Sequence, residues 1–263
     1  MKISAILFDL DDTLMSECPA EDEAFVAACE LARERYDLDP DALHKAVRSH
    51  AEELWQTGEW FEFGDSIGMA SWEAMWASFE GDDPRLAELK KWALEYRPKA
   101  WNLALADFDI DDAAFANELL ERYQHERHMR HKPFDDAAEL LEDLRGEFKL
   151  GLLTNGAPDV QQTKLDGSGL EPYFDAVVIT GKIGIGKPDP RPFEIVLEQL
   201  DVPASEAVMV GNSMVSDVLG AHNAGVKSIW LNLDGTWAVD GITPDVEIHS
   251  LKELRPALEK LDC

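Results

Sequence analysis

Strand-like and helix-like patterns alternate along the second half of the chain, and this alternation restricts the possible folds more than any other feature. Short, nearly continuous apolar segments are separated by segments in which apolar residues recur at helical spacing. Such strands are typical of a parallel sheet covered by helices on both faces. We therefore expect an α/β fold. The expected strands are 149–154, 176–180, 207–210 and 227–232, and the expected helices are 135–144, 160–165, 190–200 and 216–224.

A further apolar segment, Ile3–Leu7, reads as a buried strand and is followed by three carboxylates. Asp9, Asp11 and Asp12 lie where this strand ends. In open α/β sheets the carboxyl ends of the strands face the ligand crevice. Asp9 and Asp11 would share one face of an extended backbone, where their like charges repel unless a cation compensates. An acidic turn that caps the next segment explains the same pattern, so the pattern alone leaves both interpretations open.

Between about Met15 and Lys132 helical patterns replace the strands. A helix that begins near Ser71 would carry Trp72, Met75, Trp76 and Phe79 on one face. Pro98 should kink or end another helix. Six of the eight tryptophans lie in this segment, and we expect most of them to pack helices together. Further helical stripes lie in 23–36, 41–56, 86–96 and 115–123. The chain therefore reads as an α/β domain, 1–15 and 133–263, with an inserted all-helical domain, 16–132.

Two short segments of the insert suggest other roles. Residues 59–65 lack helical spacing and are a candidate surface for a ligand, because loops carry recognition more often than helix faces do. The basic segment 125–132 reads as a solvated helix C-terminus, where positive charge complements the helix dipole. His125 and His128 have a spacing that could hold a metal, but a third ligand is undefined and the neighbouring arginines oppose a cation.

Two motifs before residue 160 resemble signatures of the haloacid dehalogenase superfamily. The first is D-x-D-x-T, here Asp9 to Thr13, directly after the N-terminal strand. The second is a strand that ends in Ser or Thr, here 148–156 with Thr154. The helical insert between them lies at the position of the family's cap domain, which for an all-helical cap indicates subfamily I with a C1-type cap.

The third and fourth signatures follow in the family's order. The third is a downstream lysine, matched by Lys187 in the sequence G-I-G-K-P-D-P. The fourth is an acidic motif after another strand, and residues 210–217 resemble it, with Asn212 where the family more often has Asp. The resemblance covers essentially the whole chain. It implies a Rossmann-like core sheet in which the strands that end at Asp9 and at Gly211 are neighbours.

The resemblance also implies roles for the motif residues. In the family the first Asp of D-x-D is a nucleophile and the second is a general acid/base, which here are Asp9 and Asp11. The implied phosphate-binding groups are Thr154, Asn155, the Gly156 amide and Lys187. The implied Mg²⁺ ligands are Asp9, the Asp11 backbone carbonyl, Asn212 and Asp217. Because Asn212 offers an amide oxygen without charge, we expect weaker binding of Mg²⁺.

These implied roles describe an Mg²⁺-dependent phosphatase that hydrolyses a small-molecule phosphate monoester through a phosphoaspartyl intermediate on Asp9. Charge agrees with this interpretation. Asp9, Asp11 and Asp217 carry three negative charges, and Mg²⁺ together with the Lys187 ammonium balances them. Caps of this kind generally go with small substrates, so the expected partner is a phosphorylated metabolite.

Three alternatives share the same fold. A 2-haloacid dehalogenase would use Asp9 as a nucleophile on carbon and would not need Asp11, because no alkoxide has to be protonated. A phosphomutase would share all four motifs. A catalytically weak protein that binds a phosphometabolite would fit the neutral side chain of Asn212. The presence of Asp11 favours phosphoryl chemistry.

The charge of the chain argues against two classes of partner. The 53 acidic and 24 basic residues give a net charge of −29, so nucleic acid and anionic membranes are not expected partners. This acidity is also compatible with a salt-rich cytoplasm, where salt screens the repulsion. No apolar run is long enough to span a membrane, and we expect a cytoplasmic protein. Cys18, Cys29 and Cys263 lack metal-ligand spacing and are expected to be reduced.

Overall fold

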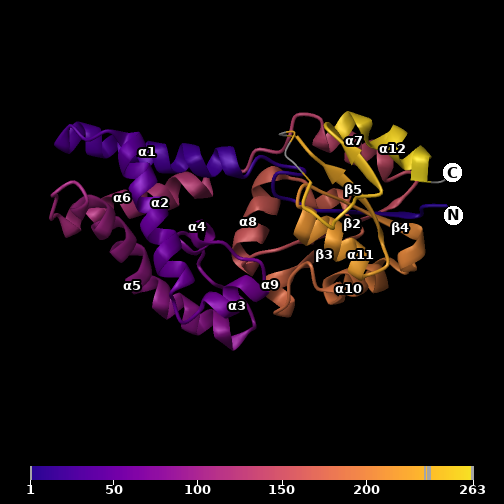
Figure 1. Cartoon of the computed structure of the whole chain (residues 1–263), viewed down its shortest axis with the longest axis horizontal. Coiled ribbons are helices and arrows are strands. Elements are labelled where there is room, and N and C mark those ends of the chain that lie inside the picture. The colour runs from indigo at the N-terminus through magenta and orange to yellow at the C-terminus, as the bar shows by residue number, and fades with distance from the viewer. Residues whose placement is uncertain (1, 234, 236–237, 262–263) are drawn as a thin grey trace. The chain divides into compact units, whose positions relative to one another are not determined.

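The computed structural model describes residues 2–233, 235 and 238–261. The chain divides into two compact units, an α/β unit and a helical unit (Figure 1). The α/β unit comprises the chain up to Ser16, Lys132–Asn155 and the chain from Ser168 onward. The helical unit comprises Glu17–His131 and Gly156–Gly167. It therefore includes a segment, 156–167, that lies within the predicted bounds of the α/β domain.

A six-stranded parallel sheet forms the centre of the α/β unit, which confirms the predicted α/β fold class. The strand order is β3-β2-β1-β4-β5-β6. Phe8 at the end of β1 pairs with Leu152 of β2 on one side and with Val210 of β4 on the other. The predicted neighbourhood of the strands that end at Asp9 and Gly211 is confirmed. The strands are β1 Ala5–Phe8, β2 Lys149–Thr154, β3 Ala176–Ile179, β4 Ala207–Gly211, β5 Lys227–Leu231 and β6 Val246–Ile248.

Helices cover both faces of this sheet, because its central strands are apolar on both sides. Figure 1 shows α7 (Ala137–Leu144) and α12 (Leu254–Leu261) on one side, and α10 (Pro190–Leu200) and α11 (Gly220–Asn223) on the other. Helix α10 begins where the sequence predicts, since Asp189 accepts the N–H of Arg191 at 2.8 Å and Pro190 suits the first helical position. Its buried face comprises Phe193, Val196, Leu197 and Leu200.

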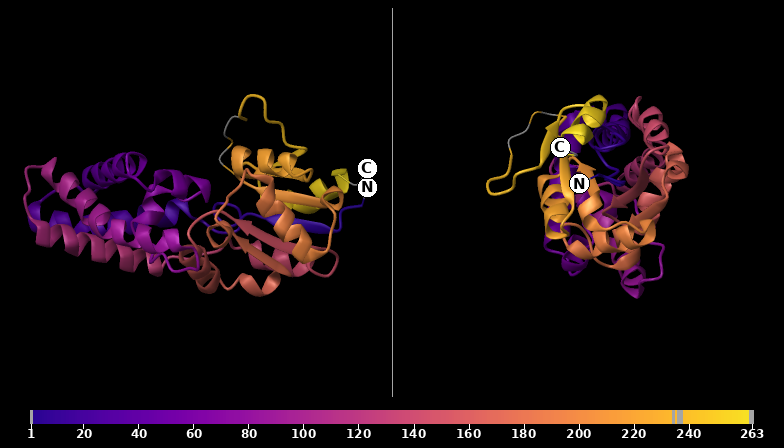
Figure 2. Two further views of the ribbon diagram at one scale, coloured as in Figure 1. Left: turned by 90° about the horizontal axis from the view of Figure 1, so that it is seen from below. Right: turned by 90° about the vertical axis from the view of Figure 1, so that its right-hand side faces the viewer.

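Four long helices pack around one apolar core in the helical unit (Figures 1 and 2). Helix α1 (Cys18–Tyr36) packs on α2 (Pro40–Gln56) and α6 (Ala113–His128), and α5 (Pro84–Ala106) also packs on α2 and α6. The shorter helices are α3 (Phe61–Ser66), α4 (Ser71–Ala74) and α8 (Pro158–Ser168). The predicted packing role of the tryptophans is confirmed: the core includes Trp55, Trp76 and Trp101, and Trp60, Trp72 and Trp92 pack against it.

The helix predicted from Ser71 is much shorter than its apolar stripe. Helix α4 ends at Ala74, and Phe79 has a positive φ of 54°. The Arg97 guanidinium donates hydrogen bonds to the backbone carbonyls of Ala74 and Ala77, which would otherwise serve a continuing helix. The four apolar side chains of the stripe still enter or contact the core.

Two other local predictions for the insert need correction. Of the two outcomes predicted at Pro98, a kink or an end, the end is excluded: helix α5 continues to Ala106, because its buried face packs along its whole length. Residues 61–65 are not a loop but belong to α3. Gly64 lets α3 approach Trp55 closely, since a Cβ there would lie 2.2 Å from the indole ring. Packing thus outweighs the weak local pattern in both segments.

The basic segment 125–132 is not fully solvated, which corrects another prediction. Arg127 is completely buried and its Nη2 lies 2.6 Å from Glu17 Oε1. Lys164 Nζ of α8 lies 3.1 Å from the same carboxylate. Burial opposes ionisation of Glu17, but the two cations outweigh it and lower its pKa. This ionic cluster ties α8 to the ends of α1 and α6 within the helical unit.

The remaining elements of the α/β unit are mostly short. They include α9 (Thr180–Ile183) and a π-helical turn, η3 (Met214–Leu219), at the start of the helix predicted over 216–224. Strand β6 and helix α12 were not predicted. Three single turns of 3₁₀-helix are η1 (Glu171–Tyr173), η2 (Ala204–Glu206) and η4 (Leu251–Glu253).

Several expected absences concern only the part of the chain that the structure describes. There, no group of three or more His, Cys, Asp or Glu side chains is arranged to hold a metal ion, at His125 and His128 or elsewhere. No described helix is both long and apolar enough to cross a membrane. Cys18 and Cys29 are free thiols, and Cys263 lies outside the described residues.

We expect Glu21→Gln to stabilise the protein near pH 8 by about 2 to 3 kcal/mol and to change little near pH 4.5. Glu21 is fully buried, and burial raises its pKa from 4.5 to about 7, although Arg48 works in the opposite direction. Because the folded chain holds this proton more tightly than the unfolded chain, the associated stability is lost as the pH rises from 4.5 to 7. Urea unfolding over this pH range measures the effect.

Glu34→Gln is the matched control for this experiment, because Glu34 is exposed on the same helix and the same change from acid to amide is made there. The control should follow the wild-type dependence on pH. If Glu21→Gln also followed the wild-type dependence, the interpretation of Glu21 as a buried, protonated carboxyl group would be wrong.

Candidate active site

The carboxyl ends of three adjacent strands bring most of the predicted site residues together in the α/β unit. Asp9 follows β1, Thr154 ends β2, and Asn212 follows β4. Because β1 lies between β2 and β4, Asp9 is central among them. The Asp9 N–H donates to the Val210 carbonyl at 3.0 Å, so the pairing of β1 with β4 continues to Asp9 itself.

A buried lysine connects the first and fourth motifs. Lys187 is 5% exposed, and its Nζ donates to Asp9 Oδ1 at 2.7 Å and to Asp217 Oδ1 at 2.6 Å. The third hydrogen bond of the ammonium goes to the Leu153 carbonyl of β2 at 2.8 Å. An ammonium has three donors, so this arrangement uses all of them. The lysine therefore binds three strand ends at once.

The surroundings shift the pKa values of Asp9 and Lys187 in this cluster. Burial raises the pKa of Asp9 to about 6, and the neighbouring Asp217 adds to this, whereas Lys187 works in the opposite direction. Burial alone would lower the pKa of Lys187, but Asp217 and Asp9 outweigh it and raise that pKa. We conclude that Lys187 is a fixed cation, and that its charge stabilises the burial of the two acidic side chains that it contacts.

The fourth motif folds so that Asp217 points back to the end of its own strand. Asp217 lies in η3, and the Ser213 N–H donates to its Oδ2 at 2.9 Å. The Ser213 hydroxyl accepts the N–H of Ser216 and so caps this turn. Gly211 is required here, since a Cβ at this position would lie 2.2 Å from the Asp217 carboxyl group.

Thr13 is a further site residue, for which the sequence predicts no role. It is fully buried, and its hydroxyl donates to Asp9 Oδ2 at 3.2 Å and accepts the Asn212 N–H at 3.1 Å. Thr13 therefore orients the second carboxylate oxygen of Asp9 and links the first motif to the fourth. The sequence feature that could have indicated this role is the threonine of the D-x-D-x-T motif.

The second motif divides between the two units. Thr154 is buried at the end of β2, and Asn155 holds the backbone of Lys187 through both ends of its side-chain amide. Gly156 begins the part of the chain that belongs to the helical unit, and its N–H donates to the Ile67 carbonyl at 2.9 Å. In this structure the predicted phosphate-binding groups Asn155 and Gly156 thus contact protein groups.

Asp11 and Asn212 are half-buried, as is Asn155. Asp11 lies in a tight turn in which Asp12 has a positive φ of 53° and its N–H donates to the Met15 carbonyl at 2.8 Å. Asn212 is held through its backbone, because its carbonyl also accepts the indole N–H of Trp230 at 2.8 Å. These contacts fix the backbone near Asp11 and at Asn212 without using the side chains of these two residues.

The donor set fits Mg²⁺ in its chemistry. Asp9 and Asp217 supply carboxylate oxygens, Asn212 an amide oxygen, and Asp11 a backbone carbonyl. Mg²⁺ prefers such oxygens, usually binds to one or two carboxylates and keeps several waters. When all three are ionised, Asp9, Asp11 and Asp217 against one lysine leave two negative charges, which a divalent cation would neutralise. No described set of three His, Cys, Asp or Glu side chains is arranged for a metal, so amide, backbone and water oxygens would be needed.

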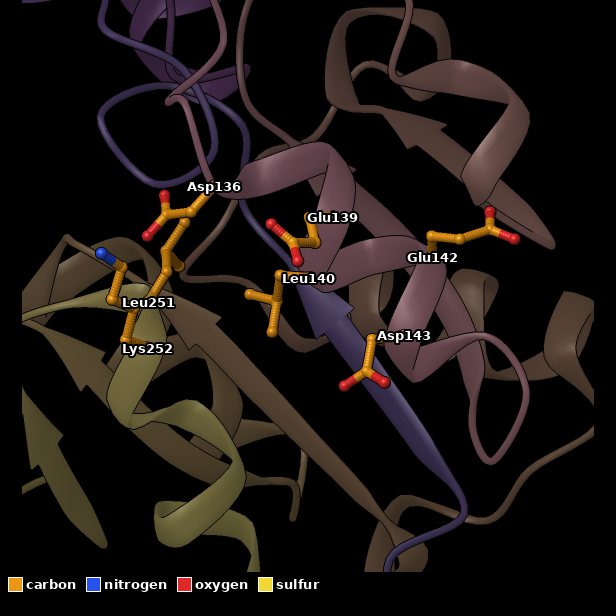
Figure 3. Close-up of a pocket in the computed structure, with 7 residues that line it drawn as sticks. All are labelled: Asp136, Glu139, Leu140, Glu142, Asp143, Leu251 and Lys252. Atoms are coloured by element: carbon orange, nitrogen blue, oxygen red, sulfur yellow. The ribbon is translucent and has the colours of Figure 1, made fainter.

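A separate hollow of the α/β unit does not resemble a phosphate site. Figure 3 shows it beside α7 and the turn that precedes α12, and its volume is about 710 Å³. Four carboxylates and one lysine give it negative charge, which opposes a phosphate ester. Its lining residues include none of the predicted site residues: they are Asp136, Glu139, Leu140, Glu142, Asp143, Leu251 and Lys252.

We expect Lys187→Met to lower the free energy of unfolding by about 3 kcal/mol when divalent cations are removed with EDTA. The substitution leaves the Asp9 and Asp217 carboxylates buried without their shared cation. Urea unfolding of the variant measures this loss. Adding Asp9→Asn should restore at least half of it, because one of the two charges is then gone.

Lys252→Met serves as the matched control, since Lys252 is an exposed lysine of the same unit. It should leave stability nearly unchanged. A Lys187→Met protein as stable as the wild type in EDTA would show that the lysine does not balance these carboxylates.

Comparison with known proteins agrees with this geometry. A family model of haloacid dehalogenase-like hydrolases matches residues 3–225. The phosphoserine phosphatase of Thermus thermophilus is 35% identical over 251 residues, which are 95% of this chain and 96% of that protein. The pyrimidine 5'-nucleotidase YjjG of Escherichia coli is 40% identical over 129 residues, which are 49% of this chain and 57% of that protein.

Solved structures of similar proteins share the fold. The HAD-hydrolase YfnB of Bacillus subtilis, bound to magnesium, has a TM-score of 0.67 and 25% identity, and the match covers 98% of this chain and 99% of that chain. The 2-haloacid dehalogenase of Pseudomonas syringae has a TM-score of 0.61 and 30% identity, with 98% and 99% covered. Because the family model spans most of the chain, and a relative matches over nearly its whole length, the chain belongs to the haloacid dehalogenase-like hydrolases.

Proposed function

We propose that this protein is an Mg²⁺-dependent phosphatase that hydrolyses a small phosphate monoester through a phosphoaspartyl intermediate on Asp9. The observation that carries the proposal is the buried Lys187 ammonium, which holds Asp9 and Asp217 together at the ends of β1 and β4. Asp11 follows Asp9 by two residues. This combination offers a nucleophile, an acid/base and a fixed cation for a phosphate group.

The reaction divides into two displacements at phosphorus. In the first, an Asp9 carboxylate oxygen attacks phosphorus, the bond to the ester oxygen breaks, and Asp11 gives its proton to the departing alkoxide. In the second, Asp11 takes a proton from water, the water oxygen attacks phosphorus, and the bond to Asp9 breaks to give inorganic phosphate. Such acid and base assistance is typically worth ~10²–10⁴-fold in rate.

The surrounding groups prepare Asp9 for this role. Thr13 binds one carboxylate oxygen of Asp9 and Lys187 the other, so the carboxylate has a fixed orientation before substrate arrives. Lys187 also offers positive charge for the phosphoryl oxygens, and the Thr154 hydroxyl is a donor at the end of the neighbouring strand. Preorganised groups of this kind do not have to reorganise during the reaction.

Asp9, the Asp11 carbonyl, Asn212 and Asp217 are the groups that we propose for Mg²⁺. The ion would neutralise the carboxylates and draw phosphoryl oxygens toward them. A magnesium-bound relative, YfnB, supports this choice of metal. Asn212 supplies no charge, so Asp9 and Asp217 must hold the metal with less electrostatic help than two acidic residues in the fourth motif would give.

The substrate class is a small phosphorylated metabolite. The helical unit, built around the insert after the first motif, would serve as the cap that excludes water from the reaction. Relatives that act on phosphoserine and on pyrimidine nucleotides support a phosphate ester of modest size. We therefore take phosphoserine and pyrimidine nucleoside monophosphates as the first substrates to test.

Dehalogenation is the second candidate, because a 2-haloacid dehalogenase is among the similar solved structures. In that reaction Asp9 would attack carbon and displace a halide. A halide needs no proton as it leaves, so Asp11 would have no acid role. The presence of Asp11 beside Asp9 therefore favours phosphate over haloacid. A phosphomutase or a weakly catalytic binding protein, with the same motifs, would show little or no release of inorganic phosphate.

We expect phosphate release from p-nitrophenyl phosphate and from at least one of the two metabolite classes with Mg²⁺, and none with EDTA. Asp9→Asn should abolish turnover. Asp11→Asn should lower it by about 10²-fold or more on alkyl esters, and by less on the aryl ester, whose leaving group needs less protonation. Phosphate release and chloride release from 2-chloropropionate are measured side by side.

Asp12→Asn is the matched control, because Asp12 lies in the same turn and its positive φ suits Asn. Asn212→Asp should reduce the Mg²⁺ concentration at half-maximal rate about tenfold, which corresponds to about 1.4 kcal/mol. Chloride release without phosphate release would favour the dehalogenase. Folded, Mg²⁺-binding protein without any turnover would favour the binding protein.

A further inference from the structure

Asn155 contacts the catalytic lysine through two hydrogen bonds to its backbone. The Asn155 Oδ1 accepts the Lys187 N–H at 2.9 Å, and the Asn155 Nδ2 donates to the Lys187 carbonyl at 3.0 Å. The two residues are 32 positions apart in the sequence. The side chain of Asn155 thus pairs with both the backbone N–H and the backbone carbonyl of Lys187, as a neighbouring β-strand would.

The end of β2 therefore fixes Lys187 at both ends of its side chain. The Leu153 carbonyl accepts a hydrogen bond from Nζ, and the Asn155 amide holds the backbone on either side of Cα. Lysine has a long stem with several rotatable bonds, so its ammonium is placed accurately only if the Cα is also fixed. Between these two anchors the stem has to reach Asp9 and Asp217.

We propose that Asn155 is a positioning residue that acts through Lys187 and not a direct ligand of the phosphate. The proposal rests on the proposed function of Lys187, and it replaces the phosphate-binding role that the motif alone suggested. The amide geometry supports it, because the donor and the acceptor of the side chain are both directed at the same residue of the protein. If a supporting side chain of this kind is loosely held, the charged group that it supports is misplaced.

Asn223, at the end of α11, offers a matched control because it contacts the same loop. Its Nδ2 donates to the carbonyl of Pro188, the residue after Lys187, at 3.0 Å, and the contact is exposed. Asn223→Ala removes one hydrogen bond to the loop, whereas Asn155→Ala removes two that flank the Lys187 Cα. Asn155→Asp keeps the shape and the acceptor but loses the donor, and it provides a second variant should Asn155→Ala fold poorly.

The first measurement is the ¹⁵N–¹H signal of the Lys187 ammonium in lysine-labelled protein, which is visible only while the group is buried and hydrogen-bonded. Lys187→Met assigns the signal. We expect Asn155→Ala to broaden or abolish it, Asn155→Asp to weaken it, and Asn223→Ala to leave it. This measurement does not depend on turnover, so it tests the proposal even if the protein proves not to be a phosphatase. An unchanged signal in Asn155→Ala would overturn the proposal.

The second measurement is a double-mutant cycle on phosphate release with Mg²⁺. Asn155→Ala alone should lower kcat/KM about 10²-fold, as a misplacement of about 1 Å does. In the Lys187→Met background it should cost less than about threefold, because the group that it positions is already gone. A full loss in that background would show a direct contact with phosphate and would overturn the proposal. If Lys187→Met has no measurable turnover, the NMR signal decides alone.

Discussion

The ammonium of Lys187 is the interaction on which the arrangement of the candidate site depends. It joins the carboxylates that follow β1 and β4 and the backbone at the end of β2, so the three central strand ends meet at one nitrogen. Two buried carboxylates without this cation would repel each other and would be costly to desolvate. The same charge that makes the cluster stable also makes it suitable for a phosphate group.

The sheet explains why these groups can meet. A parallel sheet directs the carboxyl ends of all its strands to one edge, and the order β2-β1-β4 makes the strands of the first, second and fourth motifs neighbours. Thr13 and Gly211 then refine the geometry, one by orienting Asp9 and the other by leaving room for Asp217. The local positive charge of Lys187 matters in a chain of net charge −29, because the overall field opposes an anionic substrate.

Much of this arrangement could be predicted from the sequence. Apolar strands and the helical periods predicted the α/β fold and the helical insert, and the family resemblance of the four motifs implied the meeting of Asp9 with the fourth motif. Predictions failed where a distant contact overrides a local pattern. Arg97 takes the carbonyls that a longer α4 would use, and Arg127 is buried by its pairing with Glu17.

The same limit applies within the site. No pattern in the sequence shows that Asn155 turns both ends of its amide to Lys187, because the two residues come together only when β2 and the lysine loop are folded. Likewise Thr13 belongs to the first sequence motif, but its hydrogen bonds to Asp9 and Asn212 depend on the pairing of β1 with β4. The sequence predicts which residues gather at the sheet edge, and tertiary geometry assigns what each of them holds.

The central claim is that the carboxylate of Asp9 forms a covalent bond to phosphorus. Acid quenching during turnover of a phosphate ester, followed by borohydride reduction, converts an aspartyl phosphate to homoserine, which peptide mass spectrometry locates. Our account predicts homoserine at position 9 and at no other aspartate. Homoserine at position 11 or 217, or none while phosphate is being released, would contradict it.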